Sequence, residues 1–493
     1  MNVKVLLLIS LVFCSFLLSA LFTPAFRRFA LWRNWVDQPD GFRKMHKIPM
    51  VRIGGAPIVL AYICSLGALL CLGANFVFTG QPPLPLLWIL LPSAVLVLAM
   101  GLLDDVIGLK PWHKLAGEVI AASLVYLGGI RIQNLGGHPY GQFLAFIITI
   151  VWLVGCTNAF NLIDGLDGLA AGVGLIASAA TLAGGLIRGD MGLAIATAPL
   201  VGALLGFLRF NFNPASIFLG DGGSLWVGFM LACYGVIWSQ KSVTALSITA
   251  PIMAMAIPLL DTSLSIARRF LRCEPIFRAD RGHIHHRLLD RGLAPRHVTL
   301  LLYGASCVGA VFSILQSTAP NQIRLLIIGA FCIMVWIGIY QLGYQEFGIA
   351  ARLVRRNVIG SMVKTQFSLR QYEQLFNSVN TVDECWHTLR TIAGELGFSE
   401  VELQLAGRNY QEHLCKSANG DWMLQVPLSD SEYVRLLCRF EFAKIEPLIA
   451  PWVDLLHRCL SAKAALLTAT HEIHLAQTEA AKDCYVLSTG HGS

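Results

Sequence analysis

Charged residues are scarce in this sequence of 493 residues, at 14% of the chain. Soluble globular proteins carry about 25%, so the scarcity excludes an ordinary soluble fold for most of the chain. The hydrophobic residues, 55% of the total, gather in runs long enough to cross a hydrocarbon layer of about 30 Å. These runs stop near residue 343, which marks a domain boundary.

Cysteine pairs of the Cys-x-x-Cys type are absent, although the chain has 13 cysteines. Their absence argues against a zinc ribbon or a redox motif, and nothing suggests a disulfide framework. No nucleic-acid-binding module is recognisable, so we expect no nucleic-acid partner. The net charge of +7 instead suggests anionic membrane lipids and an anionic substrate as partners.

The apolar runs predict an all-α polytopic membrane protein with about eleven transmembrane helices. The fourth run is the weakest because Glu118 interrupts it. The first run could be a signal peptide, but Arg27 and Arg28 follow it, which favours a retained anchor. The predicted spans are residues 3–23, 53–73, 86–103, 115–130, 142–158, 167–187, 191–208, 222–238, 243–260, 297–316 and 323–343.

Lysine and arginine are nearly missing from alternate loops. Residues 74–85 contain neither, whereas the loops after the first and ninth spans are strongly basic. Because cytoplasmic loops carry the excess of lysine and arginine, we expect both basic loops in the cytoplasm. The N-terminus then lies outside and the C-terminus inside.

The tail has the composition of a soluble domain. Two amphipathic helical stretches precede alternating strand-like segments and a closing helix. This order resembles a GAF-type sensory fold. We therefore predict a membrane domain at residues 1–345 and a cytoplasmic α/β domain, GAF-like and regulatory, at residues 346–493.

Carboxylates near a membrane are costly and indicate function by default. Here they gather at one end of the predicted spans, and the predicted orientation places that end in the cytoplasm. One shared active site is the simplest explanation. The set comprises Asp104 and Asp105 after the third span, Asp164 and Asp167 at the start of the sixth, Asp221 before the eighth and Asp261 at the end of the ninth.

The spacing within this set has physical content. Asp164 and Asp167 share a face if their turn is helical, and the glycine after each leaves room for a ligand. A helix N-terminus beside carboxylates suits a phosphate bridged by a divalent cation. Asp104 and Asp105 are adjacent and diverge by about 100° on a helix, so we expect them to have different roles.

Oxygen ligands without cysteines favour Mg²⁺, or Mn²⁺, over zinc. The cluster of His283, His285 and His286 is the one feature that suggests zinc. No cysteine or carboxylate with metal-ligand spacing accompanies it, and five arginines, Arg281 among them, lie between residues 278 and 296. We interpret this loop as a clamp for pyrophosphate or sugar; a zinc site and a merely solvated basic loop are the alternatives.

The first basic loop adds four candidate substrate-binding residues near the membrane surface, Arg43, Lys44, His46 and Lys47. Membrane topology alone accounts for part of this charge. Pro49 and the glycines at 54 and 55 favour an ordered loop over a simple charge anchor.

Four sequence blocks occur in the order of a known family pattern: RKMHKIPMVRIGG, DDVIGLKPWHKL, NAFNLIDGLDGLAAG and LGDGGSLWVG. Over residues 1–343 the chain resembles the polyprenyl-phosphate N-acetylhexosamine-1-phosphate transferases. A fifth block, DRGHIHHRLLDRG, is similar to the branch that uses UDP-GlcNAc and related UDP-sugars. The resemblance implies Mg²⁺-dependent transfer of a HexNAc-1-phosphate, GlcNAc-1-phosphate first, to undecaprenyl phosphate with release of UMP. It also implies the inner membrane of a bacterium and a pathway to cell-surface polysaccharide such as lipopolysaccharide O-antigen.

The resemblance also implies roles for individual residues. Asp221 matches the principal Mg²⁺ ligand, with Asp167 and Asp104 as further ligands. The acidic pair, Asp104 and Asp105, matches residues assigned either to the lipid phosphate or to the metal and nucleotide. Asn158, Asn161, Asp164 and Asp167 match the nucleotide and metal motif, Lys114 a phosphate-contacting lysine, and His283, His285 and His286 the sugar-nucleotide loop.

Several alternatives stay open. A transporter would also hold carboxylates, although usually near the bilayer midplane at broken helices. A prenyl-chain enzyme would need DD-x-x-D motifs, and DDVIG lacks the last aspartate. Within the transferase hypothesis, we favour direct attack by the lipid phosphate over a covalent phospho-aspartyl intermediate on Asp104 or Asp105. A homodimer is compatible with the sequence.

Overall fold

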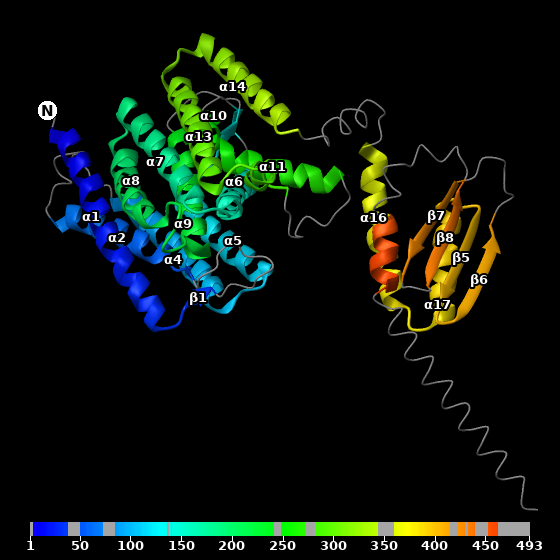
Figure 1. The fold of residues 1–493 in the computed structure, drawn as a ribbon. Coiled ribbons are helices and arrows are strands. Elements are labelled where there is room, and N and C mark those ends of the chain that lie inside the picture. The colour runs from blue at the N-terminus through cyan, green and yellow to red at the C-terminus, as the bar shows by residue number, and fades with distance from the viewer. Residues whose placement is uncertain are drawn as a thin grey trace, which may run out of the picture. The chain divides into compact units, whose positions relative to one another are not determined.

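The computed structural model describes residues 3–37, 50–71, 84–135, 138–139, 141–240, 248–271, 282–343, 359–414, 422–428, 432–438 and 452–461. Its contacts divide the chain into two compact units. The first comprises Met1–Ile266 with Ala279–Tyr344, and the second comprises Ala267–Arg278 with Gln345–Ser493. Long helices make up the first unit, and the second contains a sheet (Figure 1).

The helices of the first unit are α1 (Val3–Trp32), α2 (Gly55–Cys71), α4 (Leu84–Ile107), α5 (Pro111–Leu127), α6 (Gln142–Ile163), α7 (Leu169–Ile187), α8 (Met191–Asn211), α9 (Gly220–Gln240), α10 (Thr249–Ala254), α11 (Ala256–Leu271), α12 (Ile284–Asp290), α13 (Pro295–Thr318) and α14 (Asn321–Gln341). Two short antiparallel ladders join β1 (Val36–Asp37) to β2 (Met50–Val51) and β3 (Asn134–Leu135) to β4 (His138–Pro139).

Eight helices among the described residues are long and apolar enough to cross a membrane: α1, α4, α6, α7, α8, α9, α13 and α14. The protein is therefore a multi-pass helical membrane protein, as the sequence predicts. The spans predicted at 53–73 and 115–130 correspond to α2 and α5, which have 17 residues each.

Residues 243–247 of the span predicted at 243–260 lie outside the described residues, and the described part of that span is not one continuous helix. The helix breaks at Met255, between α10 and α11, and α11 continues to Leu271. Pro258 explains the break, because it has no N–H to donate to the carbonyl of Ala254 one turn earlier.

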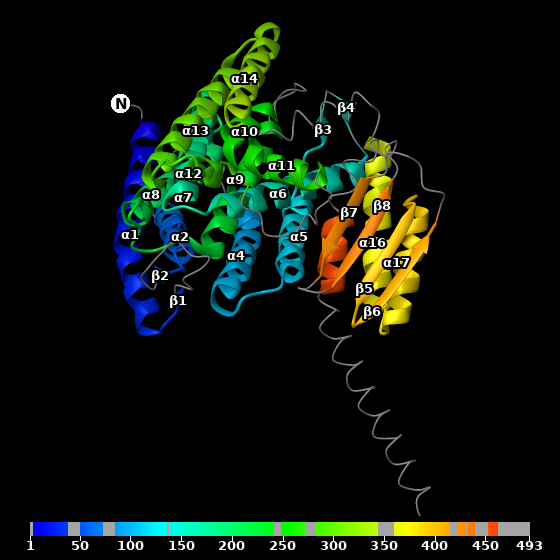
Figure 2. The same cartoon turned by 45° about the vertical axis from the view of Figure 1, so that its right-hand side comes forward.

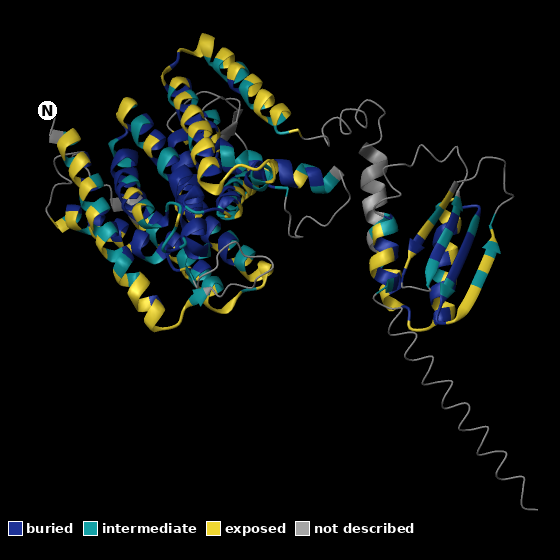
Figure 3. Ribbon diagram, in the orientation of Figure 1, coloured by how far each residue is buried: buried dark blue, intermediate teal, exposed yellow. Residues whose placement is uncertain are grey.

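The centre of the first unit is α9. Of its 18 most apolar consecutive residues 94% are buried, against 6% for α14. Glycines let neighbouring helices approach α9 closely: a Cβ on Gly101 of α4 would lie 2.5 Å from the Cα of Gly222. Buried residues accordingly concentrate inside the bundle, whereas α1 and α14 present exposed residues (Figure 3). The N-terminus of α9 is thus a fixed point on which a site can be built.

Helix α1 is long and firmly attached to α8. The Ser15 and Ser19 hydroxyls donate to the carbonyls of Pro199 and Ala203 at 2.7 and 2.8 Å. Near its cytoplasm-facing end in the predicted topology, Arg27 donates from Nε to the carbonyl of Ser216 at 2.9 Å. This contact ties α1 to the segment that leads into α9.

The second unit contains an antiparallel sheet of order β6-β5-β8-β7 (Figure 2). Its elements are α16 (Ile359–Ser378), α17 (Val382–Glu395), β5 (Glu400–Leu405), β6 (Arg408–His413), β7 (Trp422–Pro427), β8 (Tyr433–Cys438) and a helix at residues 452–461. One face of β5, with Val401 and Leu403, packs on the helices through Phe376 and Leu389. On the other face Glu402 pairs with Arg435 at 2.7 Å.

Alternation of apolar and polar residues does not predict strand β6. Its residues RNYQEH are polar, and the structure leaves most of them exposed at the edge of the sheet. An edge strand of this kind has no apolar alternation to reveal it.

Candidate active site

The N-terminus of α9 is held by a carboxylate from α4. The Asp105 oxygens Oδ1 and Oδ2 accept from the backbone N–H groups of Asp221 and Gly222, both at 2.9 Å. The first N–H groups of a helix have no partner within the helix, so Asp105 caps α9 from a neighbouring element. These two hydrogen bonds fix the position of the Asp221 backbone.

A lysine ammonium lies between two carboxylates at this point. Lys114 Nζ donates to Asp104 Oδ2 at 2.9 Å and also to Asp221 Oδ2. The other Asp104 oxygen accepts from the N–H of Leu109 at 2.6 Å. Lys114 stands in the first turn of α5, which Pro111 begins at a position that suits proline. Three helices therefore meet at one charged centre.

The donor set at this centre fits a divalent cation of the Mg²⁺ type. Within the described ranges no three His, Cys, Asp or Glu side chains converge to hold a metal ion unaided. Magnesium, however, commonly takes one or two carboxylates and completes its shell with water and substrate phosphates. Asp104 and Asp221, which already share one cation, offer that arrangement.

Asp164 and Asp167 lie in the turn between α6 and α7 and not on a continuous helix, so the conditional prediction of a shared helical face does not apply. Asp167 Oδ2 accepts from Asn213 Nδ2 and from the N–H of Ala215, both at 3.0 Å. Enclosure by the protein, followed by the negative charge of Asp221, raises the pKa of Asp164 to about 8. Asp164 therefore shares the electrostatic field of the Asp221 centre.

The histidine cluster reaches the same turn. A Cβ on Gly165 would lie 2.5 Å from His285 Nε2, so the imidazole covers this glycine. His283 Nδ1 is 2.8 Å from Asp261 Oδ2, and Asp261 Oδ1 accepts from the N–H of Ile284 at 2.6 Å. Burial lowers the pKa of His285 to about 4, which leaves its ring neutral at physiological pH.

The three histidine rings lie against one another beside the acidic turn. The His283 and His285 rings are stacked with their centroids 5.7 Å apart, and the His285 and His286 rings are tilted by 42° with their centroids 4.3 Å apart. The structure thus brings together residues that the sequence separates by more than 100 positions. Arg43, Lys44, His46, Lys47 and Arg281 lie outside the described residues.

Two asparagines of α6 face neighbouring helices. Asn161 Nδ2 donates to the Ser224 hydroxyl of α9 at 3.0 Å, and Asn158 Nδ2 donates to the Glu118 carboxylate of α5. Glu118 and Ser224 are missing from the predicted site. The interruption of an apolar run by Glu118 is the one sequence signal that points to it, and taken alone this signal indicates only a weak span.

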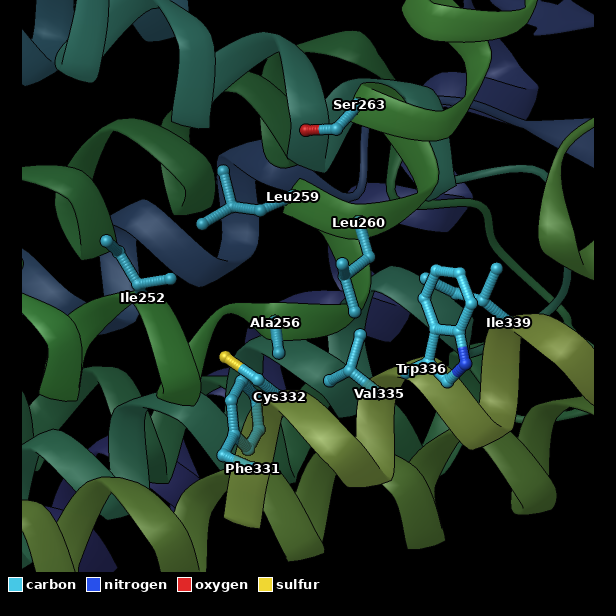
Figure 4. A pocket seen from close by; sticks show the side chains of 10 residues that line it. All are labelled: Ile252, Ala256, Leu259, Leu260, Ser263, Phe331, Cys332, Val335, Trp336 and Ile339. Carbon is cyan, nitrogen blue, oxygen red and sulfur yellow. The ribbon is translucent and has the colours of Figure 1, made fainter. Parts of the chain in front are cut away.

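A separate apolar cavity of about 320 Å³ lies between α11 and α14 (Figure 4). Leu259 and Leu260 face Val335 and Trp336 across it. Its lining is mostly apolar and contains no Asp, Glu, His, Lys or Arg side chain to bind a metal ion or a phosphate, so it is not the candidate active site.

The comparisons with known proteins concern this part of the chain. Residues 87–239, which contain the Asp104–Lys114–Asp221 centre, match the model of glycosyl transferase family 4. A probable undecaprenyl-phosphate N-acetylglucosaminyl 1-phosphate transferase of Bacillus subtilis is 34% identical over 305 residues, which are 61% of this chain and 81% of the relative.

Two further relatives are similar over a comparable share of the chain. A decaprenyl-phosphate N-acetylglucosaminephosphotransferase of Mycobacterium tuberculosis is 34% identical over 305 residues, which are 55% of this chain and 74% of the relative. A phospho-N-acetylmuramoyl-pentapeptide-transferase of Levilactobacillus brevis is 31% identical over 327 residues, which are 61% of this chain and 95% of the relative.

Proposed function

Because the chain belongs to the polyprenyl-phosphate N-acetylhexosamine-1-phosphate transferase family, we propose that it transfers GlcNAc-1-phosphate from UDP-GlcNAc to undecaprenyl phosphate and releases UMP. The observation that carries this proposal is the Lys114 ammonium held between Asp104 and Asp221 at the capped N-terminus of α9. Each of the three relatives is a transferase by name, so the transporter alternative has no support among them.

The reaction joins two anions, so the residues of the site must position both substrates and neutralise their negative charge. An oxygen of the lipid phosphate attacks the phosphorus that carries the sugar, a new P–O bond forms, and the bond to UMP breaks. The attacking oxygen is already anionic, so a strong base is not needed. Positioning and neutralisation of charge account for most catalysis of this type.

The side chains of the site divide this work. Lys114 places positive charge at the phosphates. Asp104 and Asp221 would hold Mg²⁺, which would supply further positive charge for the diphosphate. Asp105 orients α9, while Asn161, Asp164 and His285 face the nucleotide sugar. The neutral His285 ring offers a hydrogen bond without adding charge.

The topology follows from the same proposal. The site faces the cytoplasm of a bacterial inner membrane, where UDP-sugars are made, the chain crosses the membrane about eleven times, and the N-terminus lies outside. In a cysteine-free background, Asn321→Cys would react with a membrane-impermeant thiol reagent from outside the cell. Ala294→Cys, at the other end of α13, would react only after permeabilisation. The reverse pattern would overturn the orientation.

The second unit lies outside residues 87–239, which the family model matches. Its sheet of order β6-β5-β8-β7 with helices on one face supports a GAF-like regulatory role. Basal transfer should survive its removal after residue 345, and loss of transfer by a folded truncated protein would assign it a part in catalysis.

The decisive experiment is an assay for UMP with purified protein in detergent. It supplies Mg²⁺, undecaprenyl phosphate and a panel of UDP-sugars, and compares the native protein with Asp221→Asn. Asp454→Asn in the second unit is the matched control for loss of a carboxylate. Lipid-dependent UMP release with UDP-GlcNAc, abolished in Asp221→Asn alone, is the expected result. No release with any UDP-sugar, from folded protein, would overturn the proposal.

A further inference from the structure

A second buried carboxylate lies one helical turn beyond Lys114. Glu118 has 2% of its surface exposed, and its Oε2 accepts from the Asn158 amide. Its other oxygen, Oε1, is buried and has no hydrogen-bond partner among the described residues. A carboxyl oxygen without a partner in a low-dielectric interior is costly, so a use for this oxygen is to be expected.

Lys114 lies four residues before Glu118 in α5. Residues four apart on a helix are neighbours on one face, and Glu118 is attracted electrostatically to Lys114 and repelled by Asp221. In the structure the ammonium points the other way and bridges Asp104 and Asp221. Two acidic sites therefore lie near the Lys114 ammonium. It contacts the first, Asp104 with Asp221, in the structure, and Glu118 is the second.

We propose that Glu118 is a positioning residue that receives the Lys114 ammonium on Oε1 when a divalent cation binds Asp104 and Asp221. The inference rests on the proposed function for the identity of the cation site. Two positive centres cannot share both carboxylates closely without strong repulsion. A nearby anion that accepts the displaced ammonium removes this obstacle to cation binding and keeps Lys114 beside the phosphates.

The asparagine contact keeps Glu118 ready for this task. Asn158 occupies one carboxylate oxygen and also donates to the Val154 carbonyl at 3.0 Å, which fixes its own orientation on α6. Glu118 is thus held with its second oxygen available. A carboxylate kept only for packing would need both of its oxygens satisfied.

The test measures cation binding without turnover. Mn²⁺ affinity is determined by electron paramagnetic resonance on the full-length protein in detergent, without substrates. The proteins compared are the native chain, Glu118→Gln, Lys114→Met and the double variant. The glutamine side chain of Glu118→Gln is not charged but keeps an oxygen that can accept from Asn158, and thermal unfolding checks that each variant is folded. Lys114→Gln replaces Lys114→Met should the latter fail to fold.

Lys114→Met should bind Mn²⁺ more tightly than the native protein, because the competing ammonium is gone. Glu118→Gln should weaken binding by about tenfold in the native background, the size of a strong coupling between neighbouring groups. In the Lys114→Met background the same change should have a much smaller effect. Glu118→Gln should also raise the KM for the cation more than it lowers kcat.

An equal loss of Mn²⁺ affinity in both backgrounds would overturn the inference, since Glu118 would then act on the cation without Lys114. No loss in either background would overturn it as well. The proposed function fails differently: Asp221→Asn would leave Mn²⁺ affinity unchanged, and the native protein would release no UMP.

Discussion

At the scale of single residues, the adjacent Asp104 and Asp105 make different kinds of contact. Their sequence positions predict different roles, and their contacts differ accordingly: Asp105 binds two backbone N–H groups, and Asp104 binds Lys114. The sequence could reveal the divergence, because it follows from helix geometry. It could not reveal which residue caps α9, because that contact joins positions 116 residues apart.

Substitution of the pair should therefore give two different phenotypes. Asp105→Ala removes a helix cap, which typically costs about 1 kcal/mol, so the free energy of unfolding should fall by about that amount and the unfolding temperature by about one to two degrees. Asp104→Asn should leave the free energy of unfolding nearly unchanged while transfer falls at least tenfold. Thermal unfolding and UMP assays on the two variants measure this, and a cap-like loss of stability in Asp104→Asn would contradict it.

Gly165 is where His285 meets the acidic turn. A methyl group there would collide with His285 Nε2, so Gly165→Ala should displace the imidazole and raise the KM for the UDP-sugar by about tenfold. Gly155→Ala is the matched control, because its added methyl meets nothing within 4 Å. Steady-state kinetics on both variants measure the KM for the UDP-sugar. Equal KM values would show that His285 does not contact the nucleotide sugar.

Protonation of His285 links stability to pH. Its pKa is lowered from 6.5 to about 4 by burial, so between these values the unfolded chain binds more protons than the folded one. The free energy of unfolding therefore falls as the pH falls through this window. His285→Gln should show a shallower decline in unfolding temperature from pH 7 to pH 4 than the native protein. Parallel curves would show that His285 is not the group responsible.

At the scale of elements, the close packing of α4 against α9 fixes the position of the helix that carries Asp221. Gly101→Ala would press a methyl group against the backbone of Gly222. Backbone cannot move aside cheaply, so we expect a loss of roughly 1–3 kcal/mol and a drop in unfolding temperature. Gly67→Ala in α2 meets nothing within 4 Å and should be neutral or slightly stabilising. Comparable unfolding temperatures for the two variants would contradict the close packing.

Elements with strong local signals could be predicted, and others could not. Long apolar runs indicated most of the membrane helices, because the bilayer imposes length and composition. The break at Met255 depends on one proline, and β6 is a polar edge strand. The pairing of Glu118 with Asn158 joins two helices whose contact no local pattern encodes.

At the scale of the whole molecule, the length of α1 and its contacts connect the candidate site to the membrane. Its 30 residues extend about 45 Å at 1.5 Å per residue, well beyond a hydrocarbon core of about 30 Å. Ser15 and Ser19 donate hydrogen bonds from α1 to carbonyls of α8, and Arg27 donates to the carbonyl of Ser216. The neighbouring Ala215 N–H donates to the Asp167 carboxylate. Because these contacts oppose sliding of α1 along its axis, we expect the helix to tilt in order to match its membrane.

From this attachment we expect the rate of transfer to depend on the thickness of the bilayer. Lipids with short acyl chains should increase the tilt of α1 and disturb the contact of Arg27, and with it the placement of Asp167. Transfer rates in vesicles of graded acyl-chain length should then pass through a maximum, and Arg27→Gln should flatten that maximum. A native protein with equal rates in every vesicle would show that hydrophobic mismatch at α1 does not reach the carboxylates.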